Sequence, residues 1–300
     1  MTAANGVDRP IFLIGCGRSG TTLLYELIAQ QTDLAWFSNV TQRFPALPQL
    51  AAASRTAGLP LVRRLAGHRA PHPAEGHAIF DRVRGGSRRE DEGVLTGHDV
   101  REGEAEQLLA IVRAHQLFHG KSRFLNKNTR NARRVSYLAA IFPDARFVHV
   151  VRDPRATAAS LLRVAFWPEL RLWWQEWQTP TELVAGGAEP ALLAADFWTH
   201  EVNQIDRDGL EVSRDRWLEV RYEDLVDDVR GQVQRITAFS ELACEAAFLD
   251  RVAERQVGSR NNKYLSLFSS ADLDGMWRVA GPTAVRHGYE PVPRSIERPA

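Results

Sequence analysis

The sequence predicts an α/β protein with a three-layer, P-loop-like fold, in which helices flank a central parallel sheet. Two short, continuous apolar runs at residues 10–15 and 146–151 suit buried parallel strands, and a third strand is expected at residues 217–221. Segments with a helical spacing of apolar residues follow these strands. Strands that alternate with helices along a chain favour a parallel sheet with helices on both faces.

The N-terminal unit is predicted as a strand, a glycine-rich loop and a helix. The strand is residues 10–15, and apolar residues at helical spacing follow within residues 21–31. Residues 34–37 are expected to form a second strand. Residues 38–100 carry scattered Pro, Gly, His and Arg and only short helical patterns, such as residues 75–84.

The rest of the chain predicts helices and strands in alternation. The expected elements are helix 102–119, strand 123–126, helix 132–142, strand 146–151, helix 191–207, strand 217–221 and a helix from residue 222. The clearest boundary is at Asp153 and Pro154, where a helix begins after a strand. An Asp at the N-cap accepts hydrogen bonds from backbone N–H groups, and proline fits the first helical position.

Composition favours one globular domain. With 44% apolar and 25% charged residues, 300 residues can bury a sizeable core. The sequence has no internal repeat and no linker long enough to divide domains. We therefore expect a single domain over residues 1–300, with flexible ends at residues 1–9 and 290–300.

Charge and cysteine content restrict the partners and the compartment. The 38 basic and 37 acidic residues leave a net charge of +1, so no global field favours a nucleic acid or an anionic membrane, and any anion site must be local. Cys16 and Cys244 are too few for a disulfide framework or a four-ligand zinc site, and they fit the reducing cytoplasm. No signal peptide is recognisable, and no apolar run approaches the ~20 residues that span a bilayer, so we expect a soluble protein.

A glycine-rich loop at residues 15–22, Gly-Cys-Gly-Arg-Ser-Gly-Thr-Thr, lies between the first strand and the first helix. Glycines let the backbone curl around an oxyanion, and the helix N-terminus adds N–H donors. The loop therefore predicts a phosphate-binding cradle. The nucleoside triphosphate P-loop has Lys where this chain has Thr21, and the cation here comes earlier, as Arg18. This difference argues against an ATPase.

A second anion site is predicted at residues 152–160, Arg-Asp-Pro-Arg-Ala-Thr-Ala-Ala-Ser. Arg152 follows a strand, at the edge where α/β proteins bind ligands, and a second helix starts there. Ser160 adds a hydroxyl, and the alanines on its side of the helix leave room for a ligand oxygen. Two anion sites require a ligand with two anionic groups.

An alternative for this motif is a magnesium site, because an apolar strand followed by Asp153 is also the pattern that holds Mg²⁺ in P-loop enzymes. The adjacent Arg152 would disfavour a cation there, and Asp153 already has a use as an N-cap.

The motifs at residues 17–24 and 152–162 resemble the 5'-phosphosulfate and 3'-phosphate motifs of sulfotransferases that use 3'-phosphoadenosine 5'-phosphosulfate (PAPS). The likeness extends to residues 124–129, 142–147 and 217–225, and it covers most of residues 10–265. The branch that the chain resembles is the bacterial group related to tyrosylprotein sulfotransferases, which carries Arg in the first motif.

The resemblance implies PAPS as the donor, adenosine 3',5'-bisphosphate as the product, and no metal. Residues implied for the 5'-phosphosulfate are Gly17, Arg18, Ser19, Gly20, Thr21 and Thr22. The 3'-phosphate would be bound by Arg152 and Ser160. A late basic segment, residues 260–263, is implied to close over the nucleotide with Asn261 and Lys263.

The transfer of a sulfuryl group resembles phosphoryl transfer, an in-line displacement in which negative charge builds up on the departing group. Arg18 and Lys127 are suited to stabilise that charge in place of a metal. Lys127 is one of only three lysines among the 38 basic residues, and the resemblance implies that it reaches the sulfuryl group.

The acceptor hydroxyl needs a general base. The tyrosylprotein branch has a Glu after the first helix, but residues 36–41 here contain no carboxylate, which argues against a tyrosine acceptor. Glu75 is the first candidate for the base and His77 the next, followed by His98 and Asp99.

The acceptor itself is left open as a carbohydrate, a lipid or another small molecule. Aromatic residues within residues 166–177 could line its cleft, or could be core, because Trp173, Trp174 and Trp177 fall at helical intervals. No feature of the sequence indicates an oligomeric state. Two other functions remain open: a P-loop kinase or nucleotide hydrolase, and a non-catalytic binder of phosphoadenosine nucleotides.

Overall fold

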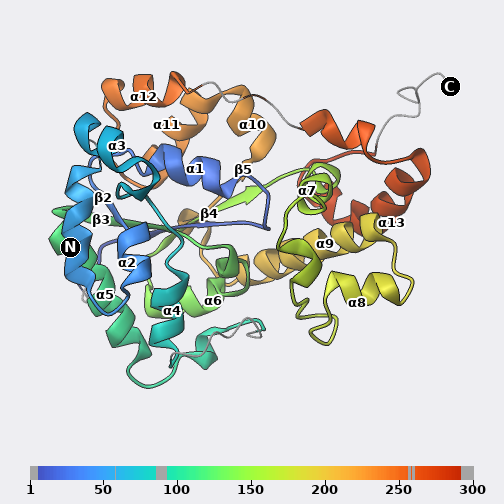
Figure 1. The fold of residues 1–300 in the computed structure, drawn as a ribbon, viewed down its shortest axis with the longest axis horizontal. Coiled ribbons are helices and arrows are strands. Elements are labelled where there is room, and N and C mark those ends of the chain that lie inside the picture. The colour runs from blue at the N-terminus through green and yellow to red at the C-terminus, as the bar shows by residue number, and fades with distance from the viewer. Residues whose placement is uncertain (1–5, 58, 86–92, 256–257, 259–260, 292–300) are drawn as a thin grey trace.

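A computed structural model of the protein describes residues 6–57, 59–85, 93–255, 258 and 261–291. Its centre is one fully parallel sheet with the strand order β2-β3-β1-β4-β5 (Figure 1). The strands are β1 (Ile11–Ile14), β2 (Leu34–Trp36), β3 (Arg123–Lys127), β4 (Arg146–Val151) and β5 (Trp217–Arg221). The predicted parallel sheet is therefore confirmed.

The carboxyl ends of all five strands lie at one edge of the sheet, because every pairing is parallel. Leu13 of β1 is in register with Lys127 of β3 and with Val148 of β4. The residues that follow β1, β3 and β4 are thereby brought to the same edge. Ligands of open α/β sheets bind at this edge.

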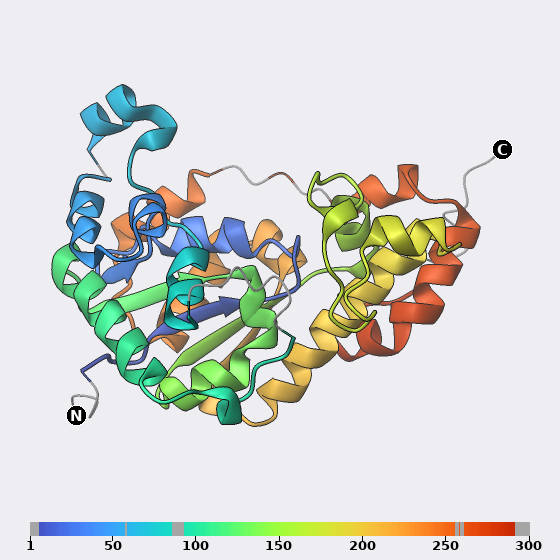
Figure 2. The ribbon, with the colours of Figure 1, turned by 60° about the horizontal axis from the view of Figure 1, so that its bottom comes forward.

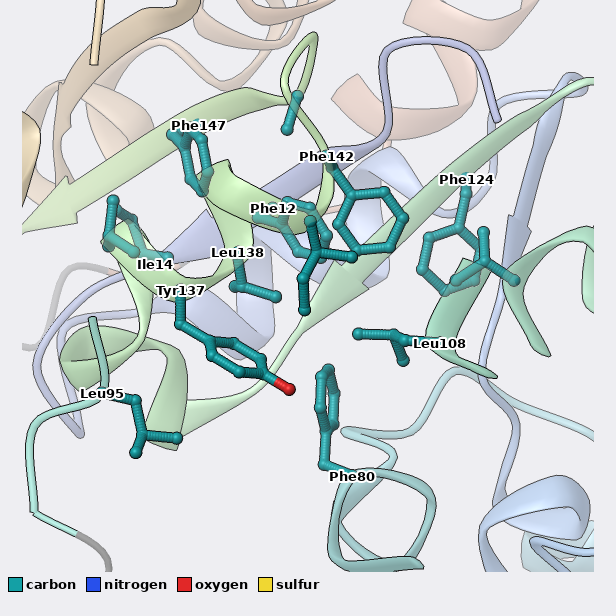
Figure 3. Packing of buried hydrophobic residues seen from close by; sticks show 14 of the residues in the cluster. Phe12, Ile14, Phe80, Leu95, Leu108, Phe124, Tyr137, Leu138, Phe142 and Phe147 are labelled. Carbon is teal, nitrogen blue, oxygen red and sulfur yellow. The ribbon is translucent and has the colours of Figure 1, made fainter. Parts of the chain in front are cut away.

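Helices cover both faces of the sheet, as predicted. Because side chains alternate along a strand, Ile11 and Leu13 face one layer of helices, and Phe12 and Ile14 face the other. The first layer contains α1 (Thr21–Ile28), α10 (Tyr222–Asp227), α11 (Val229–Phe239) and α12 (Ala246–Ala253). The second layer contains α4 (His77–Val83), α5 (Glu104–His119) and α6 (Val135–Ile141). Figure 3 shows Leu138 of α6 near Phe12, and Leu108 of α5 between Phe124 and Phe80, in this second layer.

A further group of helices lies to one side of the sheet (Figures 1 and 2). Its members are α7 (Pro154–Leu161), α8 (Pro180–Ala185), α9 (Pro190–Gly209) and α13 (Ser270–Arg286). A separate apolar cluster holds them to the sheet, and it includes Val151 at the end of β4, Trp198 of α9 and Met276 of α13. The indole of Trp198 donates a hydrogen bond of 2.9 Å to the carbonyl of Arg152. This contact fixes α9 directly beside the end of β4.

The stretch between β2 and α5 is built from short helices. They are α2 (Asn39–Arg43), η1 (Pro48–Thr56), α3 (Pro60–Ala66), η2 (Gly67–Arg69), α4 and η3 (Gly97–Asp99). Such short elements leave little periodicity in a sequence, which is why the region showed only short helical patterns, such as residues 75–84.

One predicted helix is divided in the structure. The helix expected over residues 132–142 is divided into η4 (Thr129–Arg133) and α6, because the backbone of Arg134 leaves the helical region with a φ of −139°. Three further 3-10 turns are η5 (Trp167–Glu169), η6 (Arg214–Arg216) and η7 (Asn261–Ser266).

Residues 7–9, within the N-terminal segment expected to be flexible, contact the rest of the fold. Val7 is buried, and Arg123 donates hydrogen bonds to the carbonyls of Asp8 and Arg9, so residues 7–9 are part of the fold. Residues 1–5 and 292–300 of the two predicted ends lie outside the described residues. Within the part of the chain that is described, no helix has the length and apolar character needed to cross a bilayer.

Candidate active site

The glycine-rich loop joins β1 to α1 at the carboxyl edge of the sheet. Gly15 passes so close to β4 that a Cβ atom would lie 2.4 Å from the carbonyl oxygen of Val150. Gly20 has a φ of 93°, and a Cβ atom there would lie 2.3 Å from the ring of Tyr222. Glycine is therefore required at both positions by contact with neighbouring elements, and at Gly20 also by the left-handed backbone.

Gly20→Ala should destabilise the protein by about 2–5 kcal/mol, because the left-handed backbone and the contact with Tyr222 both oppose a side chain. Gly187 is a matched control, since its φ is 99° and a Cβ atom at this position would have no neighbour within 4 Å. Gly187→Ala should cost only about 1–2 kcal/mol for the backbone alone. Urea denaturation measures both, and equal losses would mean that Tyr222 does not confine the loop.

The loop also holds a buried hydroxyl group without a partner. Ser19 is fully buried, and its Oγ has no hydrogen-bond partner among the described residues. Buried polar groups are normally paired, so an unpaired hydroxyl in a loop of this kind fits a ligand oxygen. Thr21, the first residue of α1, is buried, and Thr22 is exposed.

The second predicted anion site begins at the end of β4. Asp153 caps α7 as predicted, and its Oδ1 accepts a hydrogen bond of 2.8 Å from the backbone N–H of Arg155. The guanidinium of Arg155 binds both carboxylate oxygens of Asp153, at 2.9 and 2.7 Å. Asp153 is thus engaged by a cation of the chain, an arrangement that leaves it poorly placed to hold magnesium.

The two motifs meet in space, although 134 to 142 residues separate the contacting groups. Arg18 Nε donates a hydrogen bond of 3.0 Å to Ser160 Oγ, and Arg152 Nη1 donates one of 3.1 Å to the carbonyl of Arg18. Thr157, one turn before Ser160 on α7, is buried, and its Oγ1 is unpaired among the described residues. Two cations and the Ser160 hydroxyl therefore meet between β1 and β4.

Arg152 is held by Tyr222 and Asn261, and Asn261 is held by Glu223; no role was assigned from the sequence to Tyr222 or Glu223. Its guanidinium lies 4.3 Å from the ring centroid of Tyr222, and its Nε donates to Asn261 Oδ1 at 3.0 Å. Asn261 in turn donates to Glu223. Burial lowers the pKa of Arg152, which nonetheless stays a cation because arginine ionises far above neutral pH. Tyr222 and Glu223 could have been found from the sequence, because they directly follow β5 and therefore lie at the carboxyl edge of the sheet.

Asn261, one of the residues expected over the nucleotide, lies next to Arg152 through this hydrogen bond. Lys263, two residues further on in η7, is exposed. Residue 260 of the predicted basic segment lies outside the described residues.

The predicted catalytic pair of Lys127 and Glu75 is in direct contact. Lys127 ends β3 and is buried, and its Nζ forms an ion pair with Glu75 Oε1. Glu75 Oε2 accepts hydrogen bonds from the backbone N–H of Thr129 at 2.9 Å and from its hydroxyl at 3.1 Å. His77 Nε2 lies 3.0 Å from the same oxygen. The two first-ranked bases from the sequence therefore lie side by side at the end of β3.

These contacts set the ionisation of Glu75. Burial raises its pKa, but the hydrogen bond from His77 and the charge and hydrogen bond of Lys127 outweigh burial, so the pKa lies well below its usual range. Glu75 is ionised at neutral pH and, while paired with Lys127, is a weak base.

The depressed pKa predicts a contribution to acid stability. Because the folded pKa of Glu75 lies below the unfolded value of about 4.3, its stabilising effect is full above that pH and is lost as the pH falls. The unfolding free energy of the wild type should therefore drop more steeply from about pH 5 to pH 3 than that of Glu75→Gln. Chemical denaturation at each pH measures this free energy. If it falls equally with pH in the wild type and in Glu75→Gln, the ion pair does not stabilise the fold.

The remaining candidates for the base have other contacts. Asp99 Oδ2 accepts hydrogen bonds from the N–H and the hydroxyl of Thr96, at 2.7 and 2.8 Å, and so closes a capping box at η3. His98 is exposed in the same turn. These two residues serve or adjoin a local cap, and neither has a contact with Lys127 within the described chain.

The tryptophan-rich segment is not helical, so its helical spacing was misleading. Residues 173–177 form turns, and Glu176 and Trp177 have positive φ angles. The indole of Trp173 donates to Glu201 at 3.0 Å, and that of Trp174 donates to Asp196 at 2.8 Å, both on α9. The segment is thus fixed to α9 by two indole hydrogen bonds, with these two rings half-buried.

A hollow of about 400 Å³ opens beside the Lys127–Glu75 pair. His77, which contacts Glu75, forms part of its wall. The other lining residues are mostly polar: Asn39, Gln42, Arg43, Ala78, Asp81 and Arg130. His77 thus joins the hollow to Glu75, and the polar residues of its wall could hydrogen-bond to a small molecule.

Together, the parallel sheet, the glycine loop and the two arginines define an α/β protein with groups suited to a doubly anionic ligand at the carboxyl edge of its strands. The sequence matches the family model of the sulfotransferase family over residues 10–246, and the chain belongs to that family. The predicted family is confirmed.

Two curated proteins are similar in sequence. The omega-hydroxy-beta-dihydromenaquinone-9 sulfotransferase Stf3 of Mycobacterium bovis is 26% identical over 179 residues, which are 58% of this chain and 43% of that protein. The protein-tyrosine sulfotransferase of Drosophila melanogaster is 22% identical over 239 residues, which are 80% of this chain and 39% of that protein. The chain spans less than half the length of either relative.

Solved structures share the fold. Sulfotransferase STF9 from Mycobacterium avium has a TM-score of 0.62 at 16% identity, and the match covers 95% of this chain and 78% of STF9. The sulfotransferase domain from the curacin biosynthetic pathway has a TM-score of 0.52 at 16% identity, with 95% and 99% covered.

Proposed function

We propose that the protein transfers a sulfuryl group from PAPS to the hydroxyl of an acceptor and releases adenosine 3',5'-bisphosphate. The observation that carries this proposal is the meeting of Arg18, Arg152 and Ser160 between β1 and β4. A ligand that engages both motifs needs anionic groups at two separate positions, and adenosine with phosphates on its 3' and 5' oxygens has them.

In this proposal the glycine loop binds the 5'-phosphosulfate and α7 binds the 3'-phosphate. The loop would contribute Gly17, Arg18, Ser19, Gly20, Thr21 and Thr22. Arg152 and Ser160 would hold the 3'-phosphate, with Asn261 and Lys263 closing over the nucleotide. The unpaired, buried hydroxyls of Ser19 and Thr157 fit this assignment, because each would gain a phosphate oxygen as acceptor.

The reaction assigns one role each to Arg18, Lys127 and Glu75. PAPS supplies the sulfuryl group and a stable leaving group when bound. Arg18 and Lys127 stabilise the charge that develops in the transition state, and Glu75 accepts the proton of the acceptor hydroxyl. When Lys127 turns toward the donor, Glu75 loses contacts that depress its pKa. Donor binding thereby makes Glu75 a stronger base.

The acceptor is a small molecule or a glycan in this proposal. The polar lining of the hollow beside His77 supports a hydroxylated acceptor. We also propose that the chain is one domain and that it works in the cytoplasm, in keeping with its two cysteines, one buried and one exposed, both unpaired.

The rival functions are less well supported. A magnesium-dependent kinase or hydrolase would need Asp153 for the metal, and both of its oxygens are bound by Arg155. A non-catalytic binder would need no ion pair between the buried Lys127 and the half-buried Glu75 at the end of β3.

Calorimetric titration separates these functions. Adenosine 3',5'-bisphosphate should bind more tightly than ATP with magnesium, because a pocket for a 3'-phosphate favours the nucleotide that carries one. A preference for ATP with magnesium would end the proposal.

A further inference from the structure

A short helical segment, residues 59–69, stands away from the rest of the molecule. It contains α3 and η2, which pack against each other, and it is the cyan projection at the top of Figure 2. Hydrogen bonds tie its base to α2: Asn39 Nδ2 donates to the carbonyl of Ala70 at 3.2 Å, and the N–H of His72 donates to Asn39 Oδ1 at 3.1 Å.

This projection exposes large apolar side chains. The exposed fractions are 52% for Leu59, 66% for Leu61 and 77% for Leu65. Leu61 and Leu65 lie four residues apart and therefore share one face of α3. Single exposed leucines are ordinary on a protein surface, but three within seven residues of a projection form a patch.

The same region carries charge of one sign. The sequence from residue 34 to residue 74 contains five arginines and no Asp or Glu, although the whole chain is nearly neutral. Arg55, Arg64 and Arg69 are exposed on or near the projection. The projection is therefore a local basic and apolar surface on a protein whose net charge is only +1.

We propose that residues 59–69 dock the protein on an anionic lipid surface. Leucines on one face of a short helix enter the boundary between headgroups and acyl chains, and neighbouring arginines bind the anionic headgroups. The projection has eleven residues, whereas a stable protein interface takes about 20–30 residues on each side. A lipid surface needs no matching shape, so it suits a small projection.

Docking there brings the polar hollow to the membrane. Asn39 anchors the base of the projection and also lines the hollow beside the Lys127–Glu75 pair. A hydroxyl carried by a lipid headgroup would meet the protein on this side. The docking itself does not depend on the proposed reaction.

Co-sedimentation with vesicles tests the proposal. The protein should sediment with vesicles of equal parts phosphatidylcholine and phosphatidylglycerol, and much less with phosphatidylcholine alone. Leu61→Ser with Leu65→Ser should lower the partition coefficient roughly tenfold or more. Arg64→Gln with Arg69→Gln should also lower the partition coefficient roughly tenfold or more, and added salt should lower it as well.

Leu210→Ser with Val285→Ser is the matched control, because these residues are 87% and 60% exposed but lie outside the projection. That control should sediment like the wild type. Absence of binding to the anionic vesicles, or an equal loss in the control, would overturn the proposal. So would self-association in solution that the Leu61 and Leu65 changes abolish, since the occupant would then be a second copy.

Affinity for adenosine 3',5'-bisphosphate, measured on every variant, should stay unchanged. This measurement separates the docking proposal from the proposed sulfuryl transfer. Vesicle binding can fail while nucleotide binding persists, and nucleotide binding can fail while vesicle binding persists.

Discussion

Arg152→Ala is expected to weaken the binding of adenosine 3',5'-bisphosphate by about tenfold to a hundredfold, while adenosine 5'-phosphate loses little. A hydrogen bond to a charged group contributes about 1.5–3 kcal/mol. The substitution would remove the proposed bond from Arg152 to the 3'-phosphate, which adenosine 5'-phosphate does not have. Calorimetric titration of both nucleotides measures the ratio directly.

Arg152 also supports the fold, because it stacks on Tyr222 and donates to the carbonyl of Arg18. Ser160→Ala is therefore a second variant that removes a smaller polar contact and leaves the guanidinium in place. It should reduce bisphosphate affinity severalfold in the same nucleotide-selective way. Arg251→Ala, at an exposed position of α12, is the control and should change neither affinity. Equal losses for the two nucleotides would contradict a 3'-phosphate pocket.

Lys127→Ala is expected to lower kcat by about a hundredfold to ten-thousandfold, with the affinity for adenosine 3',5'-bisphosphate largely retained. Positioned charge stabilisation and proton transfer each contribute effects of this size. The measurement is sulfuryl transfer from PAPS to whichever sugar, phenol or sterol of an acceptor panel the wild type uses. Transfer that survives the change would remove Lys127 from the mechanism.

Glu75→Gln shows whether Lys127 and Glu75 act as a unit. Two residues that cooperate in one step give losses that are far from additive. The double variant Lys127→Ala, Glu75→Gln should therefore lose little more activity than the more damaging single change. Fully additive losses would show that the ion pair seen at the end of β3 has no catalytic meaning.

The strand β4 and the helix α7 could be predicted because their signals are local. A continuous apolar run, an Asp at the N-cap and a Pro at the first helical position follow one another along the chain. The helix α13 gave no such signal, since Gly275, Gly281 and Pro282 are poor helix formers. It forms because Ala280 and Ala284 are buried in the cluster shared with α9, so tertiary packing overrides propensity.

In the candidate site, too, some features could be predicted from the sequence and others depend on long-range contacts. The meeting of Arg18 with Ser160 follows from parallel topology, because both motifs come directly after strands that end at one edge. The position of Glu75 could only be guessed, since it depends on Asn126 and Asn128, whose side chains donate to its carbonyl at 3.2 and 3.0 Å. Such long-range contacts leave no periodic trace in the sequence.

The acceptor region was the hardest part to predict from the sequence. The tryptophans of residues 173–177 have helical spacing, yet hydrogen bonds to Asp196 and Glu201 hold two of them in turns. The polar hollow instead combines residues from α2, α4 and η4, which are distant in sequence and show no distinctive pattern individually.

A crystal structure with adenosine 3',5'-bisphosphate tests the central claim most directly. The 3'-phosphate should contact the guanidinium of Arg152 and the hydroxyl of Ser160, and the 5'-phosphate should lie against the N–H groups of residues 18–22. A nucleotide bound with its 3'-phosphate in solvent, or bound away from the ends of β1 and β4, would contradict the account.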